Sequence, residues 1–214
     1  MIKLLLAYDG ADSRLGTYFS SCFSDLETHA STCGSFEVCA INEHHDETHL
    51  EENIASFQGT PFLFAAYTHG RQDAIVHKGT ALVHTTNAYF FGGSLVYTCA
   101  CSAGQELAGI LRAQGCRAFI GFSADTILLS TEAHDDIFRD CENYGLKIFM
   151  SGEKTIKESY QAMYENYTKR FDEFCEIGFA ECPFDLAALL DVRNALFMDA
   201  EGNEHLTLAD FASS

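Results

Sequence analysis

Short apolar blocks recur along the first 122 residues, and segments with helical patterning separate them. Each block is four to seven residues long and nearly continuous in hydrophobic side chains, which is typical of strands buried on both faces of a parallel sheet. We expect five such strands: Ile2–Tyr8, Phe36–Ile41, Phe62–Tyr67, Leu95–Thr98 and Ala118–Phe122. Their alternation with helices predicts an α/β fold with a mostly parallel central sheet.

Helical patterns fill the intervals between the blocks and dominate the chain past residue 130. The expected helices cover residues 15–26, 50–57, 104–114, 137–149, 155–174 and 184–191. We also expect a terminal hairpin formed by residues 196–198 and 206–208, and a long irregular loop over residues 71–93. Because the chain has only two prolines in 214 residues and no linker-like stretch, a single domain over residues 1–214 is expected.

Charge and hydropathy exclude several classes of partner. Thirteen Lys and Arg residues against 31 Asp and Glu give a formal net charge of −18, which repels phosphate backbones and anionic membrane surfaces. We therefore expect no nucleic-acid or membrane partner, whereas a basic substrate or protein would be attracted. No apolar stretch approaches the roughly 18 to 20 residues that span a bilayer. The nine cysteines are an odd number, so they cannot all pair, and the sequence does not start with a secretory pattern. We therefore expect free thiols and a cytoplasmic location.

Two of the expected strands end in residues that can carry chemistry. His69 and Gly70 follow the block Phe62–Tyr67, and Cys101 follows the block Leu95–Thr98. Ligands of open parallel sheets bind beyond the carboxyl ends of the strands, so an imidazole and a thiol would share one crevice if these strands are neighbours. Nucleophilic cysteine catalysis requires this pair of groups, although each residue alone is more often structural. A helix starting after Cys101 would also stabilise the thiolate through its N-terminal dipole.

The two strand endings together resemble the caspase-like (clan CD) cysteine peptidases, most closely the CHAT and separase branch. Residues 99–104 are similar to the Ser-Ala-Cys block of that family, residues 107–114 to its helix, and residues 115–121 to its Gly-x-Arg-Ala-x-Ile-Gly strand. The likeness continues through a helix pair and covers about residues 1–165. It implies a caspase-like three-layer α/β/α sandwich and a thiol peptidase that requires no metal or organic cofactor.

By this resemblance Cys101 is the nucleophile, His69 is its partner, and no third acid is nominated. The backbone N–H groups of Gly70 and Cys101 would form the oxyanion hole. Cys101 is favoured over Cys99 because alanine precedes it and the expected helix follows it. Cys99 would point to the other face of the strand end, where a neutral packing role is expected.

Substrate specificity has two conflicting indications. Asp125 stands where separase-like members carry an acid that receives Arg or Lys, and Asp73 is a second candidate for this role. Asp125 could equally be a solvated turn aspartate, and for Asp73 this simpler role is favoured. Arg14 lies in a Ser-Arg-x-Gly-Thr segment similar to that of animal caspases, which receive Asp, but residues 126–130 lack their second basic residue. We therefore expect cleavage after a basic residue, and a surface or capping role for Arg14.

Other clusters carry weaker hypotheses. The cluster of residues 43–46 with His49 has a zinc-like His-x-x-x-His spacing. The pattern places no cysteine or third ligand, so a solvated acidic helix start is favoured. Asp9 and Asp12 suggest the acidic pocket of a receiver domain, but such a domain needs an aspartate where this chain has His69. The acidic stretch after the first strand also speaks against a flavodoxin-like phosphate loop.

The alternative to an enzyme is a catalytically silent caspase-like scaffold that binds a protein partner through the same crevice. Small stand-alone members of the family resemble effectors of larger bacterial systems, including antiviral defence. No evident self-processing site is present, so we expect an activating or inhibitory protein partner besides the protein or peptide substrate.

Overall fold

The structure is a computed structural model that describes residues 1–42, 45–126, 134–178 and 181–213. Its central element is a six-stranded sheet in the order β2-β1-β3-β7-β8-β9, in which all neighbours are parallel except β8 and β9. The strands are β1 (Ile2–Tyr8), β2 (Phe36–Ile41), β3 (Phe62–Tyr67), β7 (Leu95–Thr98), β8 (Ala118–Phe122) and β9 (Leu196–Asp199). The first five agree residue by residue with the expected blocks.

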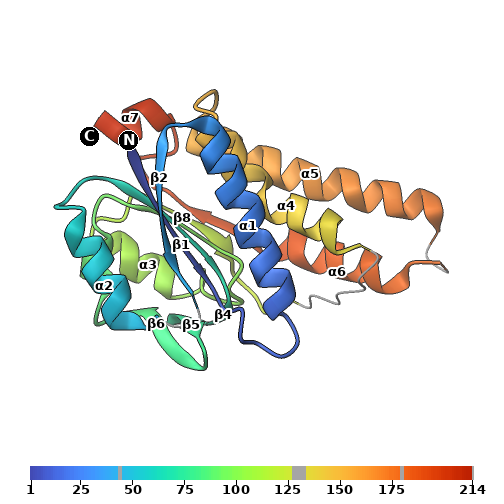
Figure 1. Cartoon of the computed structure of the whole chain (residues 1–214). Helices are drawn as coiled ribbons and strands as arrows, with labels where there is room; N and C mark the ends of the chain where they lie inside the picture. The colour runs from blue at the N-terminus through green and yellow to red at the C-terminus, as the bar shows by residue number, and fades with distance from the viewer. Residues whose placement is uncertain (43–44, 127–133, 179–180, 214) are drawn as a thin grey trace.

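Helices cover both faces of this sheet, as Figure 1 shows. One layer contains α1 (Gly16–Cys33), α4 (Asp135–Met150), α5 (Ile156–Ile177), α6 (Pro183–Ala195) and α7 (Leu208–Ser213). The other contains α2 (Glu47–Ser56), α3 (Leu107–Ala113) and the short 3-10 helix η1 (Ala88–Phe91). The expected α/β fold, a three-layer sandwich around a mostly parallel sheet, is confirmed.

Alternate residues of each strand enter the two cores. In β1, Leu4 and Leu6 pack with α1 and α4 in one core, while Leu5 and Ala7 pack with α2 in the other. Successive side chains of a strand point to opposite faces, so a strand buried on both sides must be apolar throughout. This requirement is why the blocks are continuous rather than alternating, and why they could be recognised in the sequence.

The long irregular loop expected over residues 71–93 is wrong. These residues belong mostly to a three-stranded antiparallel sheet of β4 (His69–Arg71), β5 (Ala74–His77) and β6 (Thr80–His84), followed by η1. Lys78 and Gly79 join β5 to β6, both with positive φ angles of 51° and 76°, the geometry of a tight hairpin turn. Strands of three to five residues are too short to show a period in the sequence.

The terminal hairpin expected from residues 196–198 and 206–208 is also wrong. Residues 196–199 form β9, which pairs antiparallel with β8 at the sheet edge. Leu206 instead accepts a hydrogen bond from the backbone N–H of Ile156 at the start of α5 (3.0 Å). Thr207 and Asp210 exchange hydrogen bonds that cap the start of α7. This segment therefore begins a helix and does not form a strand.

Helix boundaries shift where a local cap decides them. The helix expected at residues 15–26 continues to Cys33. It ends there because Gly34, with a φ of 66°, adopts the left-handed conformation of a helix C-cap. The helix expected from residue 104 begins only at Leu107.

No helix within the described ranges combines the length and apolar character needed to cross a membrane. All nine cysteines are free thiols, as expected.

Candidate active site

The carboxyl ends of β3 and β7 lie side by side at one edge of the central sheet. The two strands pair in parallel up to Ala66 and Thr98. The backbone N–H of Cys99 extends this pairing by donating to the carbonyl of Ala66 (3.2 Å). The segments that continue from these ends carry His69 and Cys101, so the two residues emerge at the same edge, as expected. The sheet of β4, β5 and β6 lies at this end of the molecule (Figure 1).

Gly70 packs directly on the backbone that precedes the thiol. A Cβ atom at residue 70 would lie 2.8 Å from both the carbonyl carbon and the Cβ of Ala100, and closer still to the carbonyl oxygen of Cys101. Real Cβ atoms do not approach other atoms so closely, so only glycine allows this contact. The contact places the peptide after His69 against the peptide before Cys101.

The turn that presents Cys101 is built by Thr98 and Ser102. The hydroxyl of Thr98 donates to the carbonyl of Ala66 (2.9 Å) and accepts from the N–H of Ala100 (3.0 Å), which bends the chain as β7 ends. Ser102 has a φ of 59°, a left-handed conformation that is uncommon for a residue other than glycine. The N–H of Cys101 has no hydrogen-bond acceptor in the described part of the chain. It is therefore available as an oxyanion donor.

Residues 122–126 run along this turn and hold it in place. Gly104 and Ser102 donate their N–H groups to the carbonyls of Phe122 (2.8 Å) and Ala124 (3.0 Å). The Ser102 hydroxyl donates to Oδ1 of Asp125 at 2.6 Å. These bonds fix the turn from the side of β8, the next strand of the sheet.

Thr126 covers one side of the Cys101 sulfur. Its backbone N–H lies 3.4 Å from Sγ, and its hydroxyl oxygen lies 3.4 Å from the same atom. The expected support from a helix dipole is wrong, because α3 begins six residues beyond Cys101 and not directly after it. The Thr126 N–H is instead the backbone donor that can stabilise a thiolate here.

His69 is held by a hydrogen bond on one side and an aromatic ring on another. Its Nε2 lies 3.0 Å from Oδ2 of Asp12, and Phe19 meets the imidazole edge-on with 5.5 Å between ring centroids. The side chain of His69 is 45% exposed and that of Asp12 is 23% exposed. In the described part of the structure, His69 and Cys101 make no direct hydrogen bond.

Cys99 has the packing role expected of it. The residue is buried, and its Sγ lies 3.9 Å from the carbonyl oxygen of Thr68. Burial, followed by the negative charge of Glu142, raises the pKa of the Cys99 thiol well above its ordinary range. The half-buried Cys101 is therefore the thiol of this strand end that a substrate can reach.

The candidate specificity residues have different surroundings. Asp125 is exposed and lies one residue before Thr126, beside the thiol, where it accepts the Ser102 hydrogen bond. Asp73 is exposed on the turn between β4 and β5 and pairs with Arg71 at 3.3 Å. The side chain of Arg14 is exposed, in keeping with a surface role.

The described residues of the other clusters are engaged in local hydrogen bonds. Asp46 caps α2 and binds Nδ1 of His49 at 2.8 Å, while His45 accepts the N–H of Asn42. Glu43 and His44, which precede His45, lie outside the described residues. No group of metal-ligating side chains occurs within the described ranges. Asp9 is buried and accepts a hydrogen bond from the backbone N–H of Lys78 (2.8 Å). It therefore links the end of β1 to the turn between β5 and β6 and does not line an acidic pocket.

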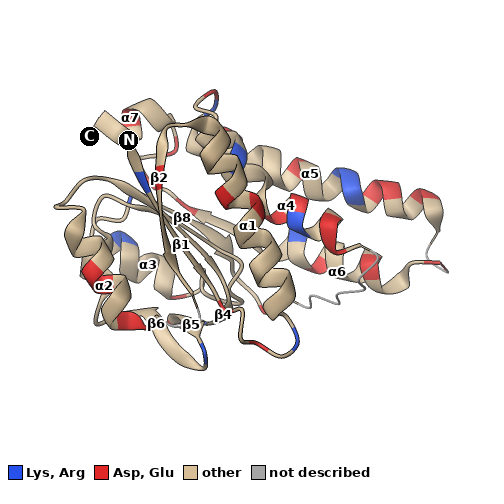
Figure 2. Ribbon diagram, in the orientation of Figure 1, with Lys and Arg blue, Asp and Glu red and all other residues tan. Residues whose placement is uncertain are grey.

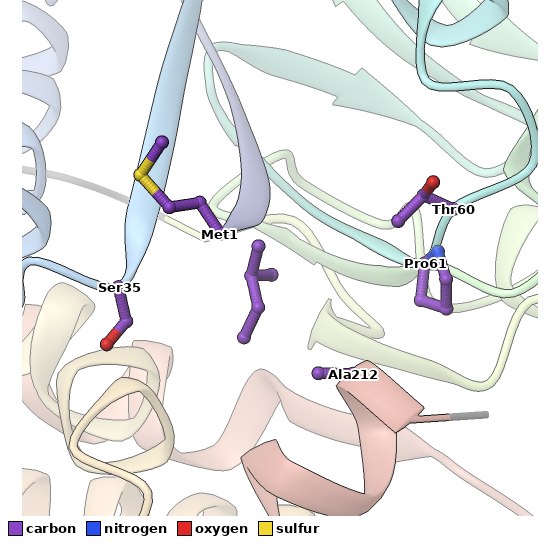
Figure 3. Close-up of a pocket in the computed structure, with 6 residues that line it drawn as sticks. Met1, Ser35, Thr60, Pro61 and Ala212 are labelled. Carbon is purple, nitrogen blue, oxygen red and sulfur yellow. The ribbon is translucent and has the colours of Figure 1, made fainter.

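A pocket of about 380 Å³ lies at the opposite, amino-terminal edge of the sheet (Figure 3). Met1, Ser35 and Pro61 immediately precede β1, β2 and β3, and Ala212 lies in α7. None of the described side chains that line it is an acid, a base or a thiol. This pocket therefore gives the catalytic hypothesis no alternative centre.

Comparison with protein-family models finds no match to this chain, and comparison with curated proteins finds none either.

The hydrogen bond from His69 to Asp12 is the main feature of the site that the sequence does not predict.

Proposed function

We propose that the protein is a caspase-like cysteine endopeptidase with Cys101 as nucleophile and His69 as general acid and base. The close packing of Gly70 on Ala100 and Cys101 carries this proposal, because it joins the two strand ends into one site. His69 would take the proton from Cys101 and the thiolate would attack the substrate carbonyl. The N–H groups of Gly70 and Cys101 would bind the oxyanion. His69 would then protonate the leaving amine and activate a water to hydrolyse the thioester.

We propose a basic residue, Arg or Lys, before the scissile bond. Asp125 supports this specificity, because its exposed carboxylate stands one residue from Thr126, which contacts the thiol sulfur. Acidic side chains also outnumber basic ones, and Figure 2 shows them on α2, α4, α5 and α6. The resulting field would attract a basic peptide.

We also propose that the resting enzyme has a low basal activity that a protein partner raises, as in an effector of a bacterial defence or regulatory system. Thr126 supports a low basal activity, since its backbone occupies one approach to the Cys101 sulfur. A substrate carbonyl that enters from that side would have to displace it.

The proposal is tested with fluorogenic peptides that carry Arg, Lys, Asp or Ala before the scissile bond. We expect hydrolysis after Arg and Lys that is lost in Cys101→Ala and His69→Ala but kept in the control Cys99→Ala. Asp125→Asn should lower hydrolysis after Arg by about tenfold, the effect of losing one charged contact. Cleavage after Asp that depends on Arg14 would instead support acidic specificity. Silence of the wild type, with and without candidate partners, would favour the scaffold.

A further inference from the structure

We infer that Asp12 is a positioning residue that fixes the tautomer and orientation of His69, leaving Nδ1 as the ring nitrogen that exchanges a proton with Cys101. The role given to Cys101 rests on the proposed function. The bond between Asp12 and His69 does not depend on it.

The hydrogen bond determines where the imidazole proton lies. Oδ2 of Asp12 is 3.0 Å from Nε2 of His69. An ionised carboxylate can only accept hydrogen bonds, so Nε2 must carry the hydrogen. The neutral ring then has its lone pair on Nδ1, and this nitrogen makes no hydrogen bond within the described part of the chain. Nε2 of His69 thus orients the ring through Asp12, and Nδ1 is the nitrogen that can exchange a proton.

Asp12 is itself held rigidly. Its Oδ1 accepts the backbone N–H groups of Leu15 (2.6 Å) and Arg14 (2.8 Å), so the two carboxylate oxygens serve different partners. The hydrogen bond from Leu15 is the main cause of a lowered pKa of Asp12, with smaller contributions from Arg14 and His69. The carboxylate therefore stays ionised at neutral pH.

The segment that carries Asp12 is packed as closely as the one that carries Cys101. A Cβ at Gly16 would lie 2.5 Å from the carbonyl oxygen of Gly10, and the N–H of Gly16 donates to the carbonyl of Asp12 (3.0 Å). This contact ties the start of α1 to the end of β1. Asp12 therefore reaches His69 from a fixed turn rather than from a loose loop.

The other described groups around His69 have partners of their own. Phe19 of α1 faces the ring edge-on and holds its plane. On the chain after His69, Arg71 pairs with Asp73 at 3.3 Å. From the side of β8, Asp125 accepts the Ser102 hydroxyl. Asp12 is thus the acid that binds the imidazole.

The proton balance of the proposed reaction follows from this geometry. Nδ1 takes the proton of the Cys101 thiol, which leaves a thiolate and an imidazolium with hydrogens on both nitrogens. Asp12 stabilises the imidazolium without accepting its proton. Nδ1 then delivers the proton to the leaving amine as the thioester forms and the peptide C–N bond breaks. A water attacks the thioester carbonyl and gives a proton to Nδ1. The C–S bond then breaks, the carboxylic acid leaves, and Nδ1 returns the proton to the Cys101 sulfur.

Asp12→Asn separates this role from a structural one. The amide oxygen of asparagine can still accept from Leu15 and Arg14, but its NH₂ group would face Nε2 and donate to it. This favours the opposite tautomer, with the hydrogen on Nδ1. The readouts are the ¹⁵N chemical shifts of His69, the rate at which iodoacetamide alkylates Cys101 as mapped by mass spectrometry, and thermal stability. Glu52→Gln on α2 removes the same charge and is the matched control.

We expect the wild type and Glu52→Gln to show the Nε2–H tautomer. Asp12→Asn should show the Nδ1–H tautomer, and its Cys101 should be alkylated on the order of tenfold or more slowly. Its thermal stability should fall only slightly, by the small contribution of the Asp12 charge. A wild-type ring with its hydrogen on Nδ1, or an Asp12→Asn variant with unchanged tautomer and alkylation, would overturn the inference. Because neither readout needs a substrate, the expected signature together with absent peptidase activity would refute the proposed function and leave the inference standing.

Discussion

Gly70 lies against Ala100 so closely that a single added methyl group would come within 2.8 Å of the Ala100 Cβ. The two residues belong to the extensions of β3 and β7, and their contact sets the spacing between the imidazole of His69 and the thiol of Cys101. Close packing at Gly70 therefore acts together with the side-chain hydrogen bonds of Thr98 and Ser102 to hold the site together.

Gly70→Ala should disrupt this spacing. The methyl group meets backbone atoms that cannot move aside, so the strand ends must separate. We expect peptidase activity to fall about 100-fold, the effect of a misplacement of about 1 Å, and stability to fall by about 1–3 kcal/mol. Peptide hydrolysis and urea unfolding measure the two effects.

Gly109→Ala is the matched control for that variant. Gly109 is exposed inside α3, and a Cβ there meets nothing within 4 Å. Alanine in a helix interior should stabilise the protein by about 0.5–1 kcal/mol and leave activity intact. Equal losses of activity in the two variants would contradict the role given to Gly70.

Glu142 on α4 should make the protein less stable as the pH rises. The residue is fully buried, and burial raises the pKa of its carboxyl to about 7, although Tyr97 donates a hydrogen bond to it (2.9 Å). Between about pH 4.5 and 7 the folded state keeps a proton that the unfolded state has lost. Stability therefore falls as pH rises through this window, by about 3 kcal/mol from this group, and is constant above it.

Glu142→Gln should remove this dependence. Urea unfolding at pH 4.5 and pH 8 is the measurement. The difference in unfolding free energy between the variant and the wild type should grow in favour of the variant by about 3 kcal/mol from the lower to the higher pH. A difference that does not change with pH would show that Glu142 is ionised in the folded state at pH 8 without a cost.

Thr155→Ala should destabilise the long helix α5. Thr155 and Glu158 form a reciprocal capping box, in which the Thr155 hydroxyl accepts the N–H of Glu158 (3.2 Å) and Glu158 accepts the N–H of Thr155 (2.9 Å). Its loss should cost about 1 kcal/mol of unfolding free energy. Thr168→Ala in the middle of α5 should cost nothing, because that hydroxyl only bonds back to the carbonyl of Tyr164.

The sequence predicts the central sheet best, because strands buried on both faces must be apolar throughout. β1 and β3 could be bounded to the residue for this reason. The residues of β4, β5 and β6 carry no comparable signal, since such short strands depend on the Lys78 turn and on packing at the sheet edge. α3 begins later than its apolar pattern predicts, because residues 102–106 form a turn fixed by hydrogen bonds to the end of β8.

Some residues of the candidate site can be predicted from the sequence and others cannot. His69 and Cys101 could be proposed because each follows an apolar block directly in the sequence. Asp12 could not, because 57 residues separate it from His69 and only the parallel pairing of β1 with β3 brings the two turns together. The contact of Thr126 with Cys101 depends on the pairing of β7 with β8 in the same way.

Covalent labelling tests the central claim, that Cys101 is the activated nucleophile, most directly. The protein is treated with a peptidyl acyloxymethyl ketone that carries Arg before the reactive group, and the modified residue is mapped by mass spectrometry. We predict one adduct, at Cys101, which is lost in Cys101→Ala and reduced in His69→Ala, while the exposed Cys175 stays unmodified. Labelling of Cys175 in preference to Cys101, or labelling of Cys101 that is indifferent to His69, would contradict the account.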